Sequence, residues 1–270
     1  MNGLLELTAM STWRRIKSLT RYKLNFMLEL FMGLIWGFGF LIFQYVVDPS
    51  VLQQVVGTTS YVSFLLIGAA FQAYYGVALW GSPNEIQNEL TTGQIEYTFS
   101  SPVSRYAYML SYVFSDAVVA TLFQIVPMTG VALLFSPMSF SLSGVMWSVA
   151  VIILTFLVFC QIGVLFSCAL LLFKNVSALG SFMNFLFQIA TGMFVPLQFM
   201  PDAFKGLAFV IPLTEGMDLT RHFLIGSNTV WPVELEFGAL LFFFTVFAVL
   251  ARFAVSYVEN RAKKEGLSVA

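Results

Sequence analysis

Charged residues are scarce in this chain. Lys, Arg, Asp and Glu make up 10% of its 270 residues, whereas 59% are hydrophobic and 30 are Phe. A soluble domain carries about 25% charged residues, so no soluble fold of this length could bury so much apolar surface. Inside a bilayer the backbone must satisfy its own polar groups, and long apolar runs do so as helices. The composition therefore predicts an all-α integral membrane protein.

Histidine and cysteine are nearly absent as well. The single histidine, His222, cannot support a multi-histidine metal site or a Ser–His catalytic set within the membrane. Cys160 and Cys168 fall in one apolar run, where eight helical positions separate them by about 12 Å. A disulfide needs Cα atoms within about 7 Å, so we interpret both cysteines as packing residues. We expect this chain to bind no metal and no other cofactor.

Signatures of nucleotide and nucleic-acid binding are missing. The net charge is −1, so the chain lacks the basic footprint of a nucleic-acid-binding protein. The Walker pattern GxxxxGK[ST], whose backbone cradles nucleotide phosphates, does not occur. We therefore expect that the chain is not itself an ATPase and has no nucleic-acid partner.

Long apolar runs, by contrast, are abundant. A membrane span needs about 20 mostly apolar residues, and six segments qualify. Pro127, within the third segment, predicts a kink or an end of the helix there. The predicted transmembrane domain covers residues 26–257, and a cytoplasmic tail follows at 258–270. Its spans are predicted at about 26–47, 61–80, 106–134, 145–173, 178–196 and 233–257.

The basic residues give the orientation. With an even number of spans both termini share a side, and Lys and Arg in short loops mark the cytoplasmic side. Only Lys205 and Arg221 lie on the side opposite the termini. Both termini are therefore expected in the cytoplasm, with the protein in the cell membrane (plasma or inner). The eleven basic residues expected in the cytoplasm are Arg14, Arg15, Lys17, Arg21, Lys23, Arg105, Lys174, Arg252, Arg261, Lys263 and Lys264.

The first 25 residues have the pattern of an interfacial amphipathic helix. Arg14, Lys17 and Arg21 lie on one helical face. A basic face opposite an apolar face that contains Trp is typical of a helix in the headgroup plane. The alternative is an ordinary positive-inside anchor without a mechanical role. The apolar stripe consists of Leu4, Leu7, Met10, Trp13 and Ile16.

Residues 82–105, SPNEIQNELTTGQIEYTFSSPVSR, form a polar island between two apolar runs. Ser82 and Pro83 are typical of an N-cap and the first helical position, and Glu85 at the third position completes a capping box. Gly93 is placed to end the helix in a left-handed conformation. The pattern predicts a separate short helix at Pro83–Thr92, with Glu85 and Glu89 on its outer face. The alternative is a solvated connector whose charges keep it in water.

Polar residues also occur within the predicted spans. Ser181, Asn184, Gln188 and Thr191 follow the spacing of one helical face, and such residues face protein or water rather than lipid. Two interpretations stay open for this face: a wall of a transport path or an interface between two copies, and ordinary hydrogen bonding between helices. Gln72 and Tyr75 in the second span are a weaker instance of the same pattern.

Two acidic residues lie inside or near the spans. Asp116 lies about 15 Å into the third span, where an ionisable group is a functional hypothesis. Snorkelling, or a pair with Gln161, is an equally open alternative for this carboxylate. Glu29, near the cytoplasmic end of the first span, is expected to pair with Lys23 or Arg105.

Two stretches resemble type-2 ABC exporter permeases, the drug and polysaccharide export family. GQIEYTFSSPVSR resembles the family pattern G-[TS]-[LI]-E-x-L-x-x-[ST]-P-[VL]-[ST]-R, and GMFVPLQFMPDAFKGLAFVIPLTEGMDLTRHFLIG resembles its later segment with PLT and D-x-x-R. Ile211 and Thr220 depart from the usual Asn and Ala, as in a divergent branch. The matching residues are Gly93, Ile95, Glu96, Pro102, Val103, Ser104 and Arg105, then Gly192, Pro196, Met200, Pro201, Pro212, Leu213, Thr214, Asp218, Arg221 and Gly226.

The resemblance implies a mechanical role for the polar island. The Pro83–Thr92 helix would be a coupling helix that docks on a separate ABC ATPase subunit, with ATP and Mg on that partner. Two ATPase copies and a second permease, identical or different, would complete the complex. The residues assigned to coupling are Glu85, Glu89, Gly93, Glu96, Pro102 and Arg105.

The resemblance also implies a partly re-entrant hairpin at the outer leaflet, at residues 194–227. Its three prolines, Pro196, Pro201 and Pro212, independently indicate broken helices rather than a seventh span. Asp218 and Arg221 belong to this segment.

The leading hypothesis is therefore the permease of an ATP-driven exporter of a hydrophobic small molecule or lipid-like substrate. The alternatives are a polysaccharide or glycolipid exporter of the same family and a secondary, ion-coupled transporter, for which Asp116 is the lone candidate carboxylate and no internal repeat is visible. A membrane enzyme lacks its cluster of His, Asp or Cys, and a structural protein would not explain the capped helix.

Overall fold

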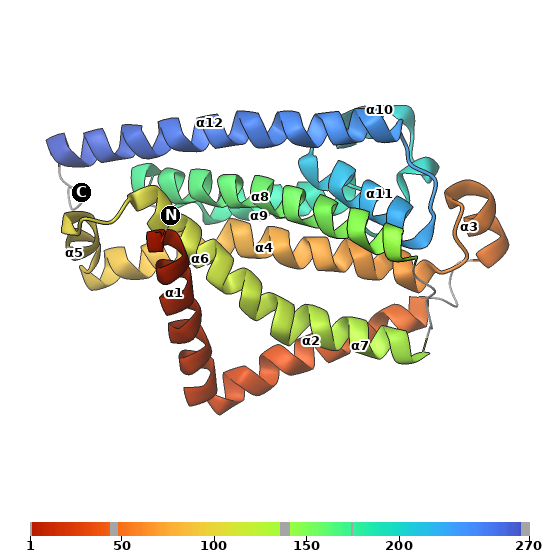
Figure 1. Cartoon of the computed structure of the whole chain (residues 1–270), viewed down its shortest axis with the longest axis horizontal. Coiled ribbons are helices and arrows are strands. Elements are labelled where there is room, and N and C mark those ends of the chain that lie inside the picture. Colours follow the sequence, from red (N-terminus) through yellow and green to blue (C-terminus); the bar gives the residue numbers. More distant parts are fainter. Residues whose placement is uncertain (1, 44–47, 136–140, 174, 266–270) are drawn as a thin grey trace.

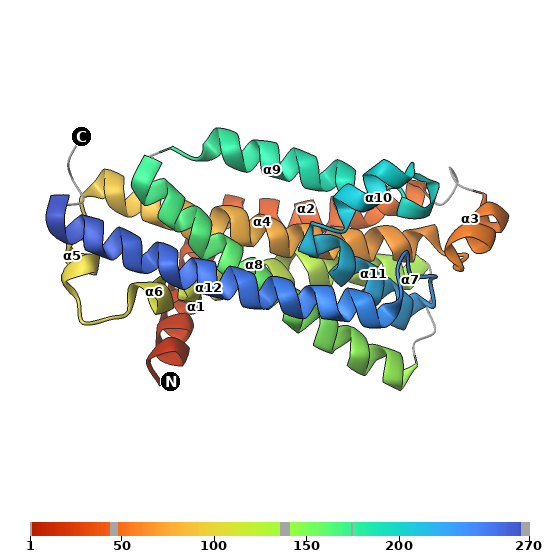
Figure 2. The ribbon, with the colours of Figure 1, turned by 90° about the horizontal axis from the view of Figure 1, so that it is seen from above.

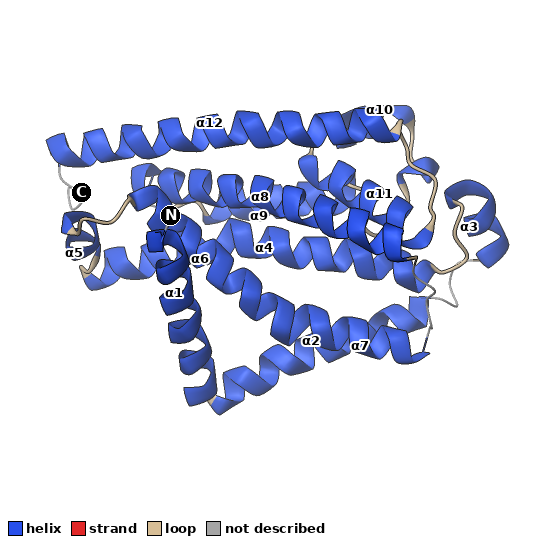
Figure 3. Cartoon of the chain, in the orientation of Figure 1, coloured by secondary structure: helices blue, strands red, loops and turns tan. Residues whose placement is uncertain are grey.

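Helices make up the regular structure of the described chain. The computed structural model describes residues 2–43, 48–135, 141–173 and 175–265, and no strand occurs among them. Figure 1 shows three long helices running alongside one another, with α8 between α4 and α12, and Figure 3 shows that loops are short. Their bounds are Tyr61–Thr92 for α4, Leu142–Phe173 for α8 and Val233–Glu265 for α12.

Four helical segments are long and apolar enough to cross a membrane. They are α4, α8, α12 and the continuous segment formed by α6, η1 and α7. A fifth crossing is counted if α1 and α2, which meet at an angle of 95°, are taken as one bent span. Together with the composition, these helices make the chain a multi-pass membrane protein. The remaining bounds are Asn2–Arg21 for α1, Lys23–Phe43 for α2, Arg105–Ala120 for α6, Thr121–Ile125 for η1 and Val126–Phe135 for α7.

The predicted fifth span is shorter than expected. Helix α9 covers Ser177–Ala190 and has 14 residues, which corresponds to about 21 Å against a hydrocarbon core of about 30 Å. Thr191 caps its C-terminus, and Gly192 then turns the chain with a φ of 71°. The six-span count therefore stays a prediction.

Pro127 does not end the third span. The helix continues through it to Phe135, and the five residues Thr121–Ile125 just before it form a π-helical turn. Proline has no N–H for an intrahelical hydrogen bond, and a wider turn is one way in which a helix accommodates such a break.

The polar island does not form a separate helix. Helix α4 runs without interruption through Ser82 and Pro83, which are both buried, and the capping box at Ser82 is therefore wrong. Ser167 of α8 donates a hydrogen bond to the Ser82 hydroxyl, at 2.9 Å. A proline inside a helix removes one backbone hydrogen bond, and packing against α8 keeps this stretch helical. The predicted end is confirmed, because Gly93 is left-handed with a φ of 71°.

Helix α2 packs closely on the segment η1–α7. A Cβ at Gly33 would lie 2.8 Å from the Gln124 carbonyl oxygen, and one at Gly37 would lie 3.1 Å from the Met128 carbonyl oxygen. Two glycines four residues apart allow two helix backbones to approach, as in GxxxG pairs of membrane helices. The contact therefore ties α2 to α7 and leaves much of α4 uncovered on that side.

The predicted hairpin consists of short helical pieces. Each of its three prolines stands at the start of one piece, which confirms the expectation of broken helices: Pro196 precedes η2, Pro201 precedes α10 and Pro212 is the first residue of α11. Helix α11 is buried along Pro212–Arg221 against α4, α8 and α12. The bounds are Leu197–Phe199 for η2, Asp202–Ala208 for α10 and Pro212–Ile225 for α11.

The short elements lie at opposite ends of the bundle. Helix α5, at Ile95–Ser100, lies at one end, and α3, at Pro49–Val56, lies at the other end (Figure 2). Helix α12 continues to Glu265, so residues 258–265 of the predicted tail are helical. Its C-terminal end and α1 both lie toward the end that carries α5 (Figure 1).

The glycine contact yields a test of the fold. We expect Gly33→Ala to lower the stability of the protein by about 1–3 kcal/mol, because the new methyl group meets a backbone carbonyl that cannot rotate away. Gly39→Ala is the matched control on the same helix, since a Cβ there meets nothing within 4 Å and alanine favours the helix. Heating detergent-solubilised protein before size-exclusion chromatography measures both; equal melting temperatures in the two variants would contradict the α2–α7 packing.

Candidate functional site

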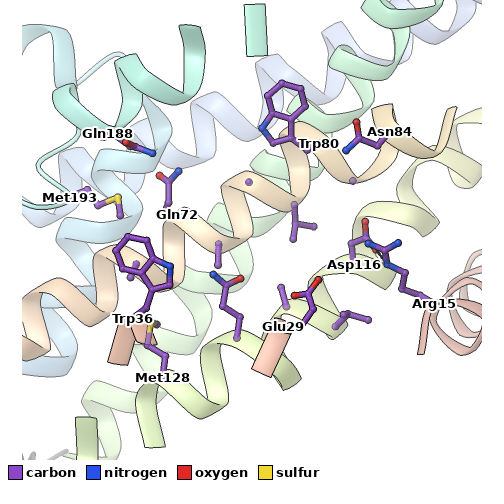
Figure 4. A pocket seen from close by; sticks show the side chains of 18 of the residues that line it. Arg15, Glu29, Trp36, Gln72, Trp80, Asn84, Asp116, Met128, Gln188 and Met193 are labelled. Atoms are coloured by element: carbon purple, nitrogen blue, oxygen red, sulfur yellow. Dashed lines mark ion pairs between the residues drawn. The ribbon is translucent and has the colours of Figure 1, made fainter. Parts of the chain in front are cut away.

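A cavity of about 770 Å³ lies between α2, α4 and the α6–η1–α7 segment, with the end of α9 on its far side (Figure 4). One end of the cavity is charged and the other is mostly apolar. The α4 residues that line it recur every three or four positions, so they form one helical face. These α4 residues include Gln72, Gly76, Trp80, Asn84 and Asn88.

Ion pairs between α1, α4 and α6 form the charged end. Arg15 Nε lies 3.1 Å from Asp116 Oδ1, and Arg15 Nη1 lies 3.8 Å from Glu85 Oε1. From the outside, Arg14 Nη2 approaches Glu85 Oε2 to 3.3 Å. The Asp116 and Glu85 side chains are 14% and 22% exposed, so these carboxylates need the partners that α1 supplies. We call this set of four residues the ionic clasp.

The position of Asp116 depends on a glycine. A Cβ at Gly81 of α4 would lie 2.7 Å from Asp116 Oδ2, so a larger residue there would displace the carboxylate. The predicted pair between Asp116 and Gln161 is wrong. Gln161 instead accepts a hydrogen bond of 2.6 Å from the Tyr106 hydroxyl.

Glu89 does not lie on an outer face. It is 7% exposed and accepts hydrogen bonds from the hydroxyls of Tyr108 and Tyr112, so its predicted exposure to a partner is wrong. The Tyr112 hydroxyl also accepts a hydrogen bond of 2.9 Å from Arg14 Nη2. The reason is that α6 packs along the end of α4, which sequence periodicity does not reveal. The exposed residues near the end of α4 are Asn84 and Asn88, which also line the cavity, and Thr91 and Thr92.

The apolar end of the cavity contains aromatic rings and methionines. Phe40, Met128 and Met193 are each at most 4% exposed. The rings of Trp36 and Phe40 lie 5.7 Å apart, and Trp80 lines the wall nearer the charged end. The cavity is therefore amphipathic along its length.

The residues predicted for a transport path divide into two groups. Gln72 and Gln188 line the cavity, and Gln72 Nε2 donates a hydrogen bond of 2.7 Å to Asn184 Oδ1. The other four do not line it. Asn184 reaches it only through Gln72, Tyr75 is buried between the rings of Phe159 and Phe187, Ser181 is exposed, and Thr191 donates a hydrogen bond to the Phe187 carbonyl.

The remaining coupling residues lie beyond the cavity. Glu96 is exposed on α5, and Pro102 is exposed in the connection to α6. Arg105 donates a hydrogen bond to the Phe99 carbonyl and lies 3.8 Å from Glu259 Oε1 of α12.

The predicted pair of Glu29 with Lys23 or Arg105 is wrong, since Glu29 makes no ion pair or hydrogen bond with any described residue.

At the opposite end of the bundle, Arg221 holds three elements together. It is 3% exposed and donates hydrogen bonds of 3.0–3.3 Å to the carbonyls of Phe64, Gly192 and Met193. Its guanidinium lies 3.4 Å from the centroid of the Phe64 ring. Arg221 therefore fastens α11 to the start of α4 and to the turn after α9.

Three buried carboxyl groups accompany Arg221. Asp218 accepts a hydrogen bond of 2.7 Å from the Val230 backbone, and Glu236 accepts one of 3.1 Å from Trp231. Glu215 is fully buried, and neither of its carboxyl oxygens has a hydrogen-bond partner in the described chain. No group of His, Cys, Asp and Glu among the described residues is arranged to hold a metal ion.

Sequence reasoning missed several residues of the cavity. The spacing of Gly33 and Gly37 around Trp36 was an available signal for a close helix contact. The partners of Arg14 and Arg15 gave no comparable signal, because α1 and α6 are about a hundred residues apart in the chain.

A family model described as ABC-2 type transporter matches residues 6–225. The match includes α1 from residue 6 onward, every residue of the ionic clasp and the whole cavity lining. No curated protein matches the chain.

The ionic clasp can be tested by a double-mutant cycle. We expect Arg15→Gln and Asp116→Asn to show an interaction energy of about 1 kcal/mol in the free energy of unfolding, since the two groups are in direct contact. Lys17→Gln, an exposed change on the same helix, combined with Asp116→Asn is the control pair and should be additive. The unfolding equilibrium in mixed micelles measures each variant, and strict additivity for Arg15 and Asp116 would show that the contact is absent.

Proposed function

Because the chain belongs to the ABC-2 type transporter family, whose membrane domains are permeases of ABC-type transporters that typically work with ABC ATPase subunits, we propose that it exports a hydrophobic or lipid-like molecule. The energy comes from ATP hydrolysed with Mg on separate subunits. The chain itself supplies the route across the membrane and no catalytic group.

The observation that carries the proposal is the link between the cavity and the end of α4. Glu85 belongs both to the cavity lining and to the ionic clasp. From Glu85 the same helix continues for seven residues to Thr92, or about 10 Å. A force on that end of α4 therefore acts directly on the charged end of the cavity.

The direction of α1 supports the placement of this end in the cytoplasm. Helix α1 runs across the axis of the long helices, as an interfacial helix does (Figure 1). Its Leu5, Met10 and Trp13 are exposed, which suits contact with lipid. With α1 in the cytoplasmic headgroup layer, the end of α4, α5 and both termini lie on the cytoplasmic side.

The surface proposed for the ATPase is the exposed end of α4 together with α5. Asn88, Glu96 and Tyr97 are exposed there, and Tyr97 is 79% exposed.

Two ATPase subunits and a second permease, identical or different, complete the proposed complex. The second permease would cover the apolar outer side chains of α9, such as Phe182 and Phe185.

The proposed transport step follows from the ion pairs. When the ATPase draws the end of α4 away from α6, Glu85 separates from Arg14 and Arg15, and the charged end of the cavity widens. The substrate then leaves toward the outer end, where Met193 and Phe194 form part of the lining.

An ion-coupled carrier is the second candidate function, and the carboxyl group of Asp116 in the cavity lining favours it. Such a carrier needs ionisable groups along its route. Export that stops with a protonophore but continues without ATP would support this function over the first.

Glu96→Arg tests the proposed coupling surface. We expect it to reduce recovery of ATPase activity with the tagged chain by about tenfold, because a reversed charge at a docking surface disfavours association. Glu234→Arg, an exposed glutamate at the opposite end of the bundle, is the control and should behave as the native chain. Membrane insertion should be unchanged in both, and undiminished recovery with Glu96→Arg would overturn the coupling assignment.

A further inference from the structure

The charges of the cavity do not balance. Three carboxylates, Glu29, Glu85 and Asp116, line it together with a single guanidinium, that of Arg15. Arg14 adds a second positive charge to the clasp from outside the lining. One negative charge therefore stays uncompensated, and that charge belongs to Glu29, which has no ion pair among the described residues.

Glu29 points to the same end of the cavity as the clasp. Figure 4 shows Glu29, Asp116 and Arg15 gathered at one end, with Trp36, Met128 and Met193 at the other. Glu29 lies close enough to Asp116 for their charges to interact. An unpaired carboxylate beside a second one, in a site partly shielded from water, attracts a cation and repels an anion.

The remainder of the lining favours an organic cation over an inorganic ion. The indole rings of Trp36 and Trp80 face the cavity, and the face of an indole ring attracts a positive charge. No carboxylate cluster suited to a metal ion occurs in the described chain. The partly exposed Ala69, Ala73 and Val77 in the lining offer an apolar surface for the rest of such a molecule.

The volume of the cavity indicates the size of the ligand. A volume of about 770 Å³ lies within the range of about 300–1,000 Å³ of sites for drug-sized ligands. A ligand can enter from the membrane on the side of α2, where Leu28 and Met32 are exposed. These two residues line a second cavity of about 440 Å³. Arg15 and Glu29 line both cavities. An amphiphile in the inner leaflet would meet the charged end at headgroup level.

We propose that the cavity binds an amphiphilic organic cation, with the charged group between Glu29 and Asp116 and the aromatic or alkyl body toward Met128 and Met193. The proposal rests on the proposed transport function and narrows its substrate class. It disfavours anionic lipids and anionic polysaccharides, whose charge Glu29 repels.

Two ions of the same shape and opposite charge test the proposal. Tetraphenylphosphonium and tetraphenylborate are dialysed against the full chain in lipid nanodiscs, with empty nanodiscs as the correction for partition into lipid. We expect tetraphenylphosphonium to bind the protein at least about tenfold more tightly than tetraphenylborate, because the two probes differ in the sign of their charge. Equal binding of the two probes would overturn the proposal.

Variants locate the bound cation. Glu29→Gln should weaken binding of tetraphenylphosphonium by about tenfold, and Trp36→Leu should weaken it by a few fold through loss of the cation–π contact. Glu234→Gln is the matched control at the other end of the bundle and should leave binding unchanged. Unaltered binding in Glu29→Gln protein that elutes as a folded species would also overturn the proposal.

The binding assay needs no ATPase, so its outcome is separate from that of the proposed function. If tetraphenylphosphonium binds through Glu29 but no ATPase activity accompanies the chain, the cation site stands and the ATP-driven export fails. If the ATPase assembles and drives export that is indifferent to Glu29→Gln, export stands and the cation site fails.

Discussion

The ion pairs of Arg14 and Arg15 with Glu85 and Asp116 are the constraint on which the rest of the structure depends. They join three helices that are distant in the chain. Without the two arginines, these two poorly exposed carboxylates would be left without a positive partner, and we expect each lost contact to cost about 1 kcal/mol. The ionic clasp therefore fixes α1 across the bundle and, with it, the charged end of the cavity.

The cavity exists because close helix contacts occur only where glycines allow them. Gly33 and Gly37 let α2 pack on η1 and α7, so α2 does not cover the polar face of α4. On the other side of α4, a Cβ at Gly163 would lie 2.6 Å from the Ala78 carbonyl, which brings α8 into close contact there. One face of α4 is thus sealed and the other stays open, and the open face carries Gln72 and Trp80.

Much of the helical plan was predictable from the sequence, because apolar runs and turn residues act locally. Gly93 ended its helix as expected, and Pro196 and Pro201 stood at the starts of short helices. The capping box at Ser82 failed because a helix already formed upstream continues through a good capping sequence when its packing favours this. The residues around Ser82 alone could not reveal that α4 was still helical at that position.

The candidate site was predicted only in part. Gln72 and Gln188 line the cavity as polar residues within a membrane should, whereas Tyr75 faces a packed core. The partners of Asp116 and the burial of Glu89 depend on how α1 and α6 pack against α4, and such contacts between distant segments leave no periodic signal. The ion pairs between distant segments could therefore be identified only from the structure.

The role of the ionic clasp is tested most directly by ATP-driven accumulation of tetraphenylphosphonium in inside-out vesicles that carry the complex. The variants exchange the charges of Arg14 and Glu85. We expect Arg14→Glu and Glu85→Arg each to abolish most of the transport. The double variant should restore about half of it or more, because the ion pair reforms with reversed sign. Full transport in either single variant, or a double variant as inactive as the singles, would contradict the claim that the clasp links the end of α4 to the cavity.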